Sequence, residues 1–98
     1  MSKFVIEDEM HSDWLGEFST LKEVIEKLQE LSATPWDEDP NRAPCMSWKT
    51  CGREYYIIKF DDSPTPWTEI NNKHIMRVDS RGATWHKTPE EIHQIFDE

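Results

Sequence analysis

The stretch Glu54–Phe60, EYYIIKF, decides the fold because it is apolar on both sides of an extended chain. Successive side chains of a strand point to opposite faces of the sheet, so Tyr56 and Ile58 share one face. Tyr55 and Ile57 share the other. Apolar residues on both faces are typical of a strand in the interior of a sheet. The sequence therefore predicts an interior strand here.

Two further strands are predicted downstream of this one. Residues 61–72, DDSPTPWTEINN, contain two prolines and several polar turn residues, which break the strand pattern. Residues 73–79, KHIMRVD, and 82–87, GATWHK, then alternate as strands do. Between them, in DSRG, Gly82 can adopt the positive φ of a short hairpin loop. The two segments therefore form a predicted hairpin.

The N-terminal stretch Lys3–Glu7, KFVIE, predicts a first strand. Phe4 and Ile6 fall on one face and Val5 falls on the other. The residues that follow, 8–19, DEMHSDWLGEFS, lack a clear period. A hairpin return and an ordered loop both fit them, and we favour a loop with some strand character.

Residues 20–31, TLKEVIEKLQEL, predict a long amphipathic helix. Its apolar residues recur at helical spacing and form a single stripe: Leu21, Val24, Ile25, Leu28 and Leu31. Thr20 and Glu23 have the T-x-x-E spacing of a capping box, which begins a helix. Pro35 ends the helix because it disfavours helical geometry at the residue before it.

A second, shorter helix is predicted over residues 88–96, TPEEIHQIF. Thr88 is placed as N-cap, Pro89 at the first helical position and Glu91 as the partner in a second capping box. The apolar face of this helix consists of Ile92, Ile95 and Phe96.

The order of these elements indicates an α+β fold. Sequential strands joined by tight turns favour an antiparallel sheet with helices packed on one face. We expect a two-layer domain with a mostly antiparallel sheet of about four strands, one long helix, one short helix and a long ordered loop. A chain of 98 residues holds one core, so residues 1–98 are predicted to form a single α+β domain.

The long loop begins at Thr34 and reads TPWDEDPNRAPCMSWKTCGR before the interior strand. Loops of this length in compact domains are uncommon and are usually functional or disordered. Its tryptophans favour order, with Trp36 and Trp48 as anchors packed against the sheet. The polar residues would then form an exposed rim: Asp37, Glu38, Asp39, Asn41 and Arg42. Because aromatic residues and arginine are enriched in protein interfaces, the predicted partner-binding residues are Trp36, Asp37, Glu38, Asp39, Arg42 and Trp48.

The charge is unevenly distributed. The net charge is −9, and residues 1–39 carry −8 of it, with three lysines against eleven acidic residues. Binding to DNA, RNA or anionic membranes requires clustered Lys and Arg, which the sequence lacks. A protein partner of basic charge fits this distribution, and an acidic surface that serves solubility alone is the alternative. The sequence does not indicate the oligomeric state.

The two cysteines, Cys45 and Cys51, lie in the long loop with five residues between them. This spacing is wider than the C-x2–4-C pairs of structural zinc sites. His74, His86 and His93 could complete a site, but nothing in the sequence places them near the loop. We expect reduced thiols that pack in the interior, and no metal or cofactor. A thiol- or metal-dependent domain that uses both cysteines is the alternative function.

Catalytic motifs are absent from the sequence: it has no nucleophile elbow and no glycine-rich phosphate loop. This favours a non-enzymatic role and leaves catalysis open. The start of the chain has no apolar leader segment and no run is long enough to span a membrane, so we expect a cytoplasmic protein.

In size, acidity and aromatic content the chain is similar to small bacterial immunity or inhibitor proteins. That resemblance rests on composition and implies neutralisation of a basic toxin or nuclease through an acidic face. The function that the sequence favours is therefore a small acidic cytoplasmic protein-binding module, of immunity or inhibitor type.

Overall fold

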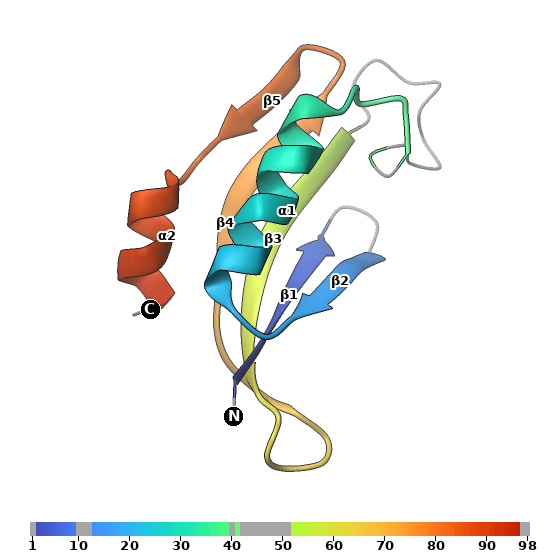
Figure 1. Cartoon of the computed structure of the whole chain (residues 1–98). Coiled ribbons are helices and arrows are strands. Elements are labelled where there is room, and N and C mark those ends of the chain that lie inside the picture. Colours follow the sequence, from blue (N-terminus) through green and yellow to red (C-terminus); the bar gives the residue numbers. More distant parts are fainter. Residues whose placement is uncertain (1, 10–12, 40, 42–51, 97–98) are drawn as a thin grey trace.

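The computed structural model describes residues 2–9, 13–39, 41 and 52–96, which form an α+β fold (Figure 1). In chain order the elements are β1 (Ser2–Asp8), β2 (Asp13–Phe18), α1 (Leu21–Ala33), β3 (Gly52–Asp61), β4 (Thr68–Asp79), β5 (Gly82–Trp85) and α2 (Pro89–Phe96). The strands form one antiparallel sheet in the order β2-β1-β3-β4-β5. The strand predicted to be interior, β3, is the central one.

Within the described residues the sheet has five strands, which is roughly consistent with the expectation of about four. The additional strand is β2, which lies in the stretch that we interpreted as a loop. It pairs with β1 from Phe4 opposite Phe18 to Asp8 opposite Asp13. Its sequence does not alternate clearly because it is an edge strand in which no residue is fully buried, and Gly16 interrupts it with a φ of 144°. The backbone of β1, rather than an apolar period, determines that this segment is extended.

β4 begins at Thr68, five residues earlier than the sequence predicted. Residues 68–72 are all polar apart from exposed Ile70, so they show no apolar period. They nevertheless pair with the end of β3, where Asn72 lies opposite Ile58. The hairpin between β4 and β5 is confirmed, and Gly82 has a φ of 111°.

Helix α1 packs its apolar stripe on one face of the sheet, as predicted. The five residues of the stripe are buried, and they join a cluster with Phe4, Ile6 and Ile57. The Thr20 hydroxyl accepts a hydrogen bond from the backbone N–H of Glu23, which caps the first turn. The helix ends at Ala33, and Thr34 before Pro35 has the extended geometry that a following proline favours (φ −93°, ψ 133°).

Helix α2 packs on the same face as α1. Its capping box is reciprocal: the backbone N–H of Glu91 donates to the Thr88 hydroxyl, and the backbone N–H of Thr88 donates to the Glu91 carboxylate. The ring of Phe96 contacts Phe4 edge to face, with 6.1 Å between the centroids. Both helices therefore cover the face of the sheet that carries Phe4 (Figure 1).

The other face of the sheet, which we call the second face, is also partly apolar. Val5 and Ile58 are directly opposite each other on β1 and β3 and both are buried there. A bulge in β4 leaves Ile75 as an extra residue, because Tyr55 pairs with Met76 whereas Tyr56 pairs with His74. The bulge lets Ile75 and Met76 both enter the core beneath the helices, and it places His74 beside Tyr56 on the second face.

Candidate partner-binding site

The segment that follows α1 is held in place by Asn41. The side chain of Asn41 is buried, and its amide nitrogen donates to the carbonyl oxygens of Leu31 and Thr34 at 2.9 and 2.8 Å. These carbonyls are at the C-terminal end of α1, where backbone acceptors have no partner within the helix. Asn41 therefore caps the helix from ten residues beyond Leu31 and lies against its C-terminal end.

Asn41 is in turn fixed by the sheet. Its side-chain oxygen accepts a hydrogen bond of 2.6 Å from the hydroxyl of Tyr55, and its backbone carbonyl accepts one of 3.0 Å from Arg53 Nε. Burial raises the pKa of Tyr55 above its usual value, so the hydroxyl remains a donor at neutral pH. We expected Asn41 in the exposed rim, and this was wrong because its side chain is buried. A buried side-chain amide needs hydrogen-bond partners, and Asn41 finds them in the backbone and in Tyr55.

Arg53 connects the loop to the first two strands. Its guanidinium binds buried Asp8 at 2.8 Å and exposed Asp13 at 2.9 Å. Burial lowers the pKa of Arg53, but hydrogen bonds to Asp13 and Asp8 outweigh this and raise it, so the side chain is positively charged. A second Asp8 oxygen accepts from the backbone N–H of Glu54 at 2.9 Å. Asn41 is thus connected to β1, β2 and β3 through the charge-assisted hydrogen bonds of Arg53, of which the one to Asp13 is partly exposed.

Three acidic side chains project from this loop. Asp37, Glu38 and Asp39, which we call the acidic turn, are all exposed. The backbone N–H of Glu38 donates to the carbonyl of Pro35 at 3.2 Å, which closes the turn. The acidic turn therefore combines exposed carboxylates with a preceding backbone that Asn41 holds through the carbonyls of Thr34 and Pro35.

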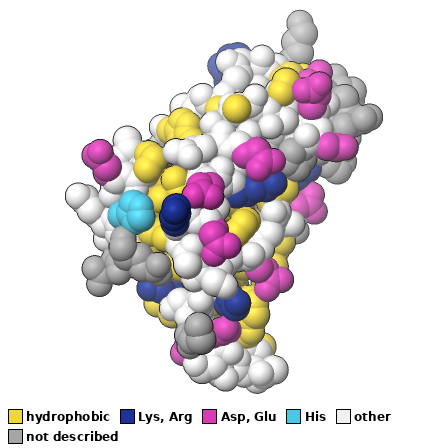
Figure 2. Space-filling model, in the orientation of Figure 1, with side chains coloured by type: hydrophobic (Ala, Val, Ile, Leu, Met, Phe, Trp, Pro, Cys, Tyr) yellow, Lys and Arg dark blue, Asp and Glu magenta, His cyan; other side chains and the backbone are white. Residues whose placement is uncertain are grey.

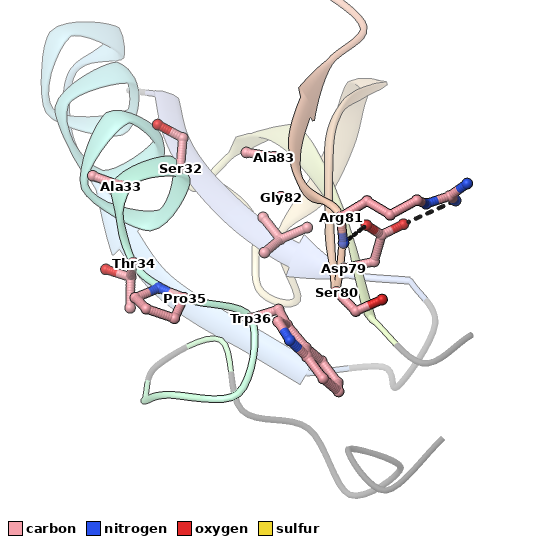
Figure 3. A pocket seen from close by; sticks show the side chains of 11 residues that line it. Ser32, Ala33, Thr34, Pro35, Trp36, Asp79, Ser80, Arg81, Gly82 and Ala83 are labelled. Atoms are coloured by element: carbon pink, nitrogen blue, oxygen red, sulfur yellow. Dashed lines mark hydrogen bonds and ion pairs between the residues drawn. The ribbon is translucent and has the colours of Figure 1, made fainter. Parts of the chain in front are cut away.

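Trp36 lies next to the acidic turn and lines a pocket of about 370 Å³ (Figure 3). The ring is half-buried and packs against the core, which agrees with the anchor that the sequence predicted. The remaining walls come from the end of α1 and from the β4–β5 hairpin: Ser32, Ala33, Thr34, Pro35, Val78, Asp79, Ser80, Arg81, Gly82 and Ala83. Trp36 is thus an anchor on one side and a pocket wall on the other.

The hairpin side of the pocket is charged. Asp79 accepts hydrogen bonds from Arg77 Nε at 2.8 Å and from the backbone N–H of Arg81 at 2.9 Å. Burial acts to raise the pKa of Asp79, but these hydrogen bonds hold it below the usual value. Arg81 is 86% exposed and extends away from the pocket in Figure 3, with Asp79 at 3.3 Å from its guanidinium. Asp79 is therefore a structural carboxylate rather than a free acid.

Two of the six predicted partner-binding residues, Arg42 and Trp48, lie outside the described residues, as do Cys45 and Cys51. The alternative function based on the two cysteines therefore stays a prediction. The structure brings the other four, Trp36 and the acidic turn, together as one continuous segment.

Three aromatic residues that no sequence pattern connects meet on the second face. Phe60 contacts Trp14 and Trp67, with 5.8 Å between ring centroids in each pair. A pocket of about 440 Å³ lies among Trp14, Glu17, Phe60, Pro66 and Trp67. Trp14 is 51% exposed. The sequence signal was the number of tryptophans, but their proximity depends on β2, which the sequence did not reveal.

Acidic side chains are not gathered into one patch on the face that carries the helices. Figure 2 shows Asp and Glu scattered over this face with Lys and Arg among them. The local acidic turn, rather than a broad acidic surface, is therefore the distinctive charged feature of this candidate site.

No helix among the described parts of the chain is long and apolar enough to cross a membrane. Comparisons of this chain with protein-family models, with curated proteins and with solved structures found no match.

Proposed function

We propose that this chain is a small cytoplasmic protein-binding module that recognises a basic protein partner through Trp36 and the acidic turn. The observation that carries the proposal is the buried capping of α1 by Asn41, which fixes an exposed run of three carboxylates beside a half-buried tryptophan. A surface that is already ordered before binding loses less conformational entropy in the complex.

The chemistry of the segment fits a lysine or arginine side chain of the partner. Carboxylates of the acidic turn would pair with its positive charge, and the Trp36 ring offers an aromatic face for a cation or for its alkyl chain. Acidic groups of this kind mainly speed association and do so in a salt-dependent way. The action would be that of an inhibitor or immunity protein, which needs no catalytic group, and neither nucleic acid nor a membrane is part of this proposal.

The first experiment is a pull-down from the native host, followed by association kinetics with the captured partner. The variant Asp37→Lys/Glu38→Lys/Asp39→Lys should associate at least about tenfold more slowly at low ionic strength. The difference should shrink at high salt because charges are screened over about 8–10 Å at moderate ionic strength. Its folding should be unchanged, since exposed charges contribute little to stability.

The matched control reverses three exposed acids elsewhere, Glu26→Lys/Glu69→Lys/Glu90→Lys. This variant has the same net charge as the first, so a local contact predicts faster association for the control than for the acidic-turn variant. Equal rates for the two variants would show that only net charge matters. An acidic partner, or an unchanged rate for the acidic-turn variant, would overturn the proposal.

A further inference from the structure

Three potential metal ligands meet on the second face, and none of them lines the Trp36 pocket. They are Glu54 on β3, His74 on β4 and His86 directly after β5. One ligand atom from each residue lies within 4.8 Å of the other two, and the imidazole centroids are 4.3 Å apart. Because β3, β4 and β5 are neighbours in the sheet, a rigid backbone brings these side chains together.

One ring nitrogen of His74 is buried beside the carboxylate of Glu54. His74 Nε2 is 2.5 Å from a carboxylate oxygen of Glu54, yet this atom is buried and has no hydrogen bond of acceptable geometry within the described part of the chain. A carboxylate oxygen and an imidazole nitrogen, which are both metal ligands, therefore lie side by side here. A metal ion placed among the three residues would bind this nitrogen and separate it from the carboxylate.

Surrounding residues orient the three side chains. The ring of Tyr56 stacks on His74 at 4.7 Å with 14° between the planes. The backbone N–H of His86 donates to the carbonyl of Ile75 at 2.7 Å. Arg77 binds the other carboxylate oxygen of Glu54, which leaves the first oxygen directed toward His74. Such supporting contacts are what orient ligands in protein metal sites.

The charge of the cluster is compatible with a cation. Arg77 lies close to Glu54, but its Nε also binds Asp79 at 2.8 Å. Asp79 also accepts from the Arg81 guanidinium at 3.3 Å, so the two carboxylates and the two guanidiniums balance. Among the three ligand residues themselves, the Glu54 carboxylate supplies the negative charge that attracts a divalent cation.

From this geometry we propose that Glu54, His74 and His86 form a binding site for a divalent first-row transition metal, with Zn²⁺ as the expected ion. Two imidazole nitrogens and one carboxylate suit Zn²⁺, whereas Ca²⁺ and Mg²⁺ prefer ligands that are all oxygen. Tetrahedral coordination at about 2.0–2.1 Å requires ligand atoms roughly 3.3 Å apart. Exposed His86 can approach to meet this requirement, and the fourth position remains for water. The site is independent of the proposed protein contact.

The test is a Zn²⁺ titration by calorimetry on the Cys45→Ser/Cys51→Ser protein, in which the thiols can no longer bind metal. If this double variant does not fold, the wild-type protein with alkylated thiols replaces it. We expect one ion per chain, a visible absorption spectrum of tetrahedral type when Co²⁺ replaces Zn²⁺, and a higher melting temperature with Zn²⁺ because the ion binds the folded state.

In the same background, His86→Gln should weaken Zn²⁺ binding at least about tenfold, the lower end of the loss that even a supporting residue of a metal site causes. His86 is exposed, so this substitution should not unfold the domain. His93→Gln removes another exposed histidine, on α2 and outside the cluster, and should leave binding unchanged. Absence of stoichiometric binding in the thiol-free protein, or equal loss in the two histidine variants, would overturn the site.

Discussion

Asn41 joins a helix, a loop and a sheet through one buried amide. Its nitrogen donates to the end of α1 and its oxygen accepts from Tyr55, so both ends of the side chain have partners. An asparagine in a loop is ordinarily expected at the surface. The contacts that bury it come from segments ten and fourteen residues away, which explains why its place could not be deduced from neighbouring residues.

Asn41→Ala should lower the free energy of unfolding by at least about 2 kcal/mol, because buried groups left without partners cost about 1–3 kcal/mol each. The measurement is urea denaturation monitored by tryptophan fluorescence. Asn72→Ala is the control: that side chain is exposed, so the change should stay within about 0.5 kcal/mol. Similar losses for both variants would contradict the capping role.

Asp79 gives the stability of the fold a dependence on pH. Its pKa is held below the usual value in the folded state, so its contribution is present above the unfolded pKa, about 3.9, and is lost as the pH falls through the folded pKa. Asp79→Asn should cost about 1.5–3 kcal/mol at pH 7, the usual contribution of a hydrogen bond to a charged group. In denaturation curves at several pH values, the difference from wild type should narrow below pH about 4. If the difference in the free energy of unfolding stays constant down to pH 2, the ionised Asp79 carboxylate is not the source of the stabilisation.

Among the elements, α1 depends most clearly on its apolar stripe. Leu28 is fully buried in the middle of the stripe, and Leu28→Ala should reduce the free energy of unfolding by about 2–5 kcal/mol, the usual range for a leucine removed from a core. The exposed neighbour Gln29→Ala is the matched control, with an expected change within about 0.5 kcal/mol. Urea denaturation distinguishes the two, and a loss below about 0.5 kcal/mol for Leu28→Ala would mean that the stripe is not core.

The elements that the sequence predicted well are those whose signals are local. The apolar stripe of α1, the capping box at Thr88 and the apolar pattern of β3 can each be recognised from a short stretch of sequence. β2 and the start of β4 do not, because polar exposed residues such as Asn72 become strand only by pairing with a neighbour. The same reason explains why the cluster of Glu54, His74 and His86 was missed: its members meet through the register of three strands.

At the scale of the whole molecule, the sheet consists of two parts that are each contiguous in sequence. β1 and β2 form a hairpin followed by α1, whereas β3, β4 and β5 form a meander followed by α2. In the sheet the two parts meet along β1 and β3, from Ser2 opposite Asp61 to Asp8 opposite Tyr55. Contacts within each part are therefore local, and those along this boundary connect distant segments.

This boundary makes the protein a candidate for fragment complementation. Two peptides covering residues 1–44 and 45–98 each contain complete elements, and each exposes an unpaired strand and an apolar face until the other is added. On mixing, they should recover the far-ultraviolet circular dichroism of the intact chain, whereas a first peptide carrying Phe4→Ala should recover less because Phe4 contacts Phe96 across the boundary. Spectra that remain the sum of the separate peptides would show that a continuous backbone is required. If the peptides do combine, the protein can serve as a split reporter whose signal requires β1 to pair with β3.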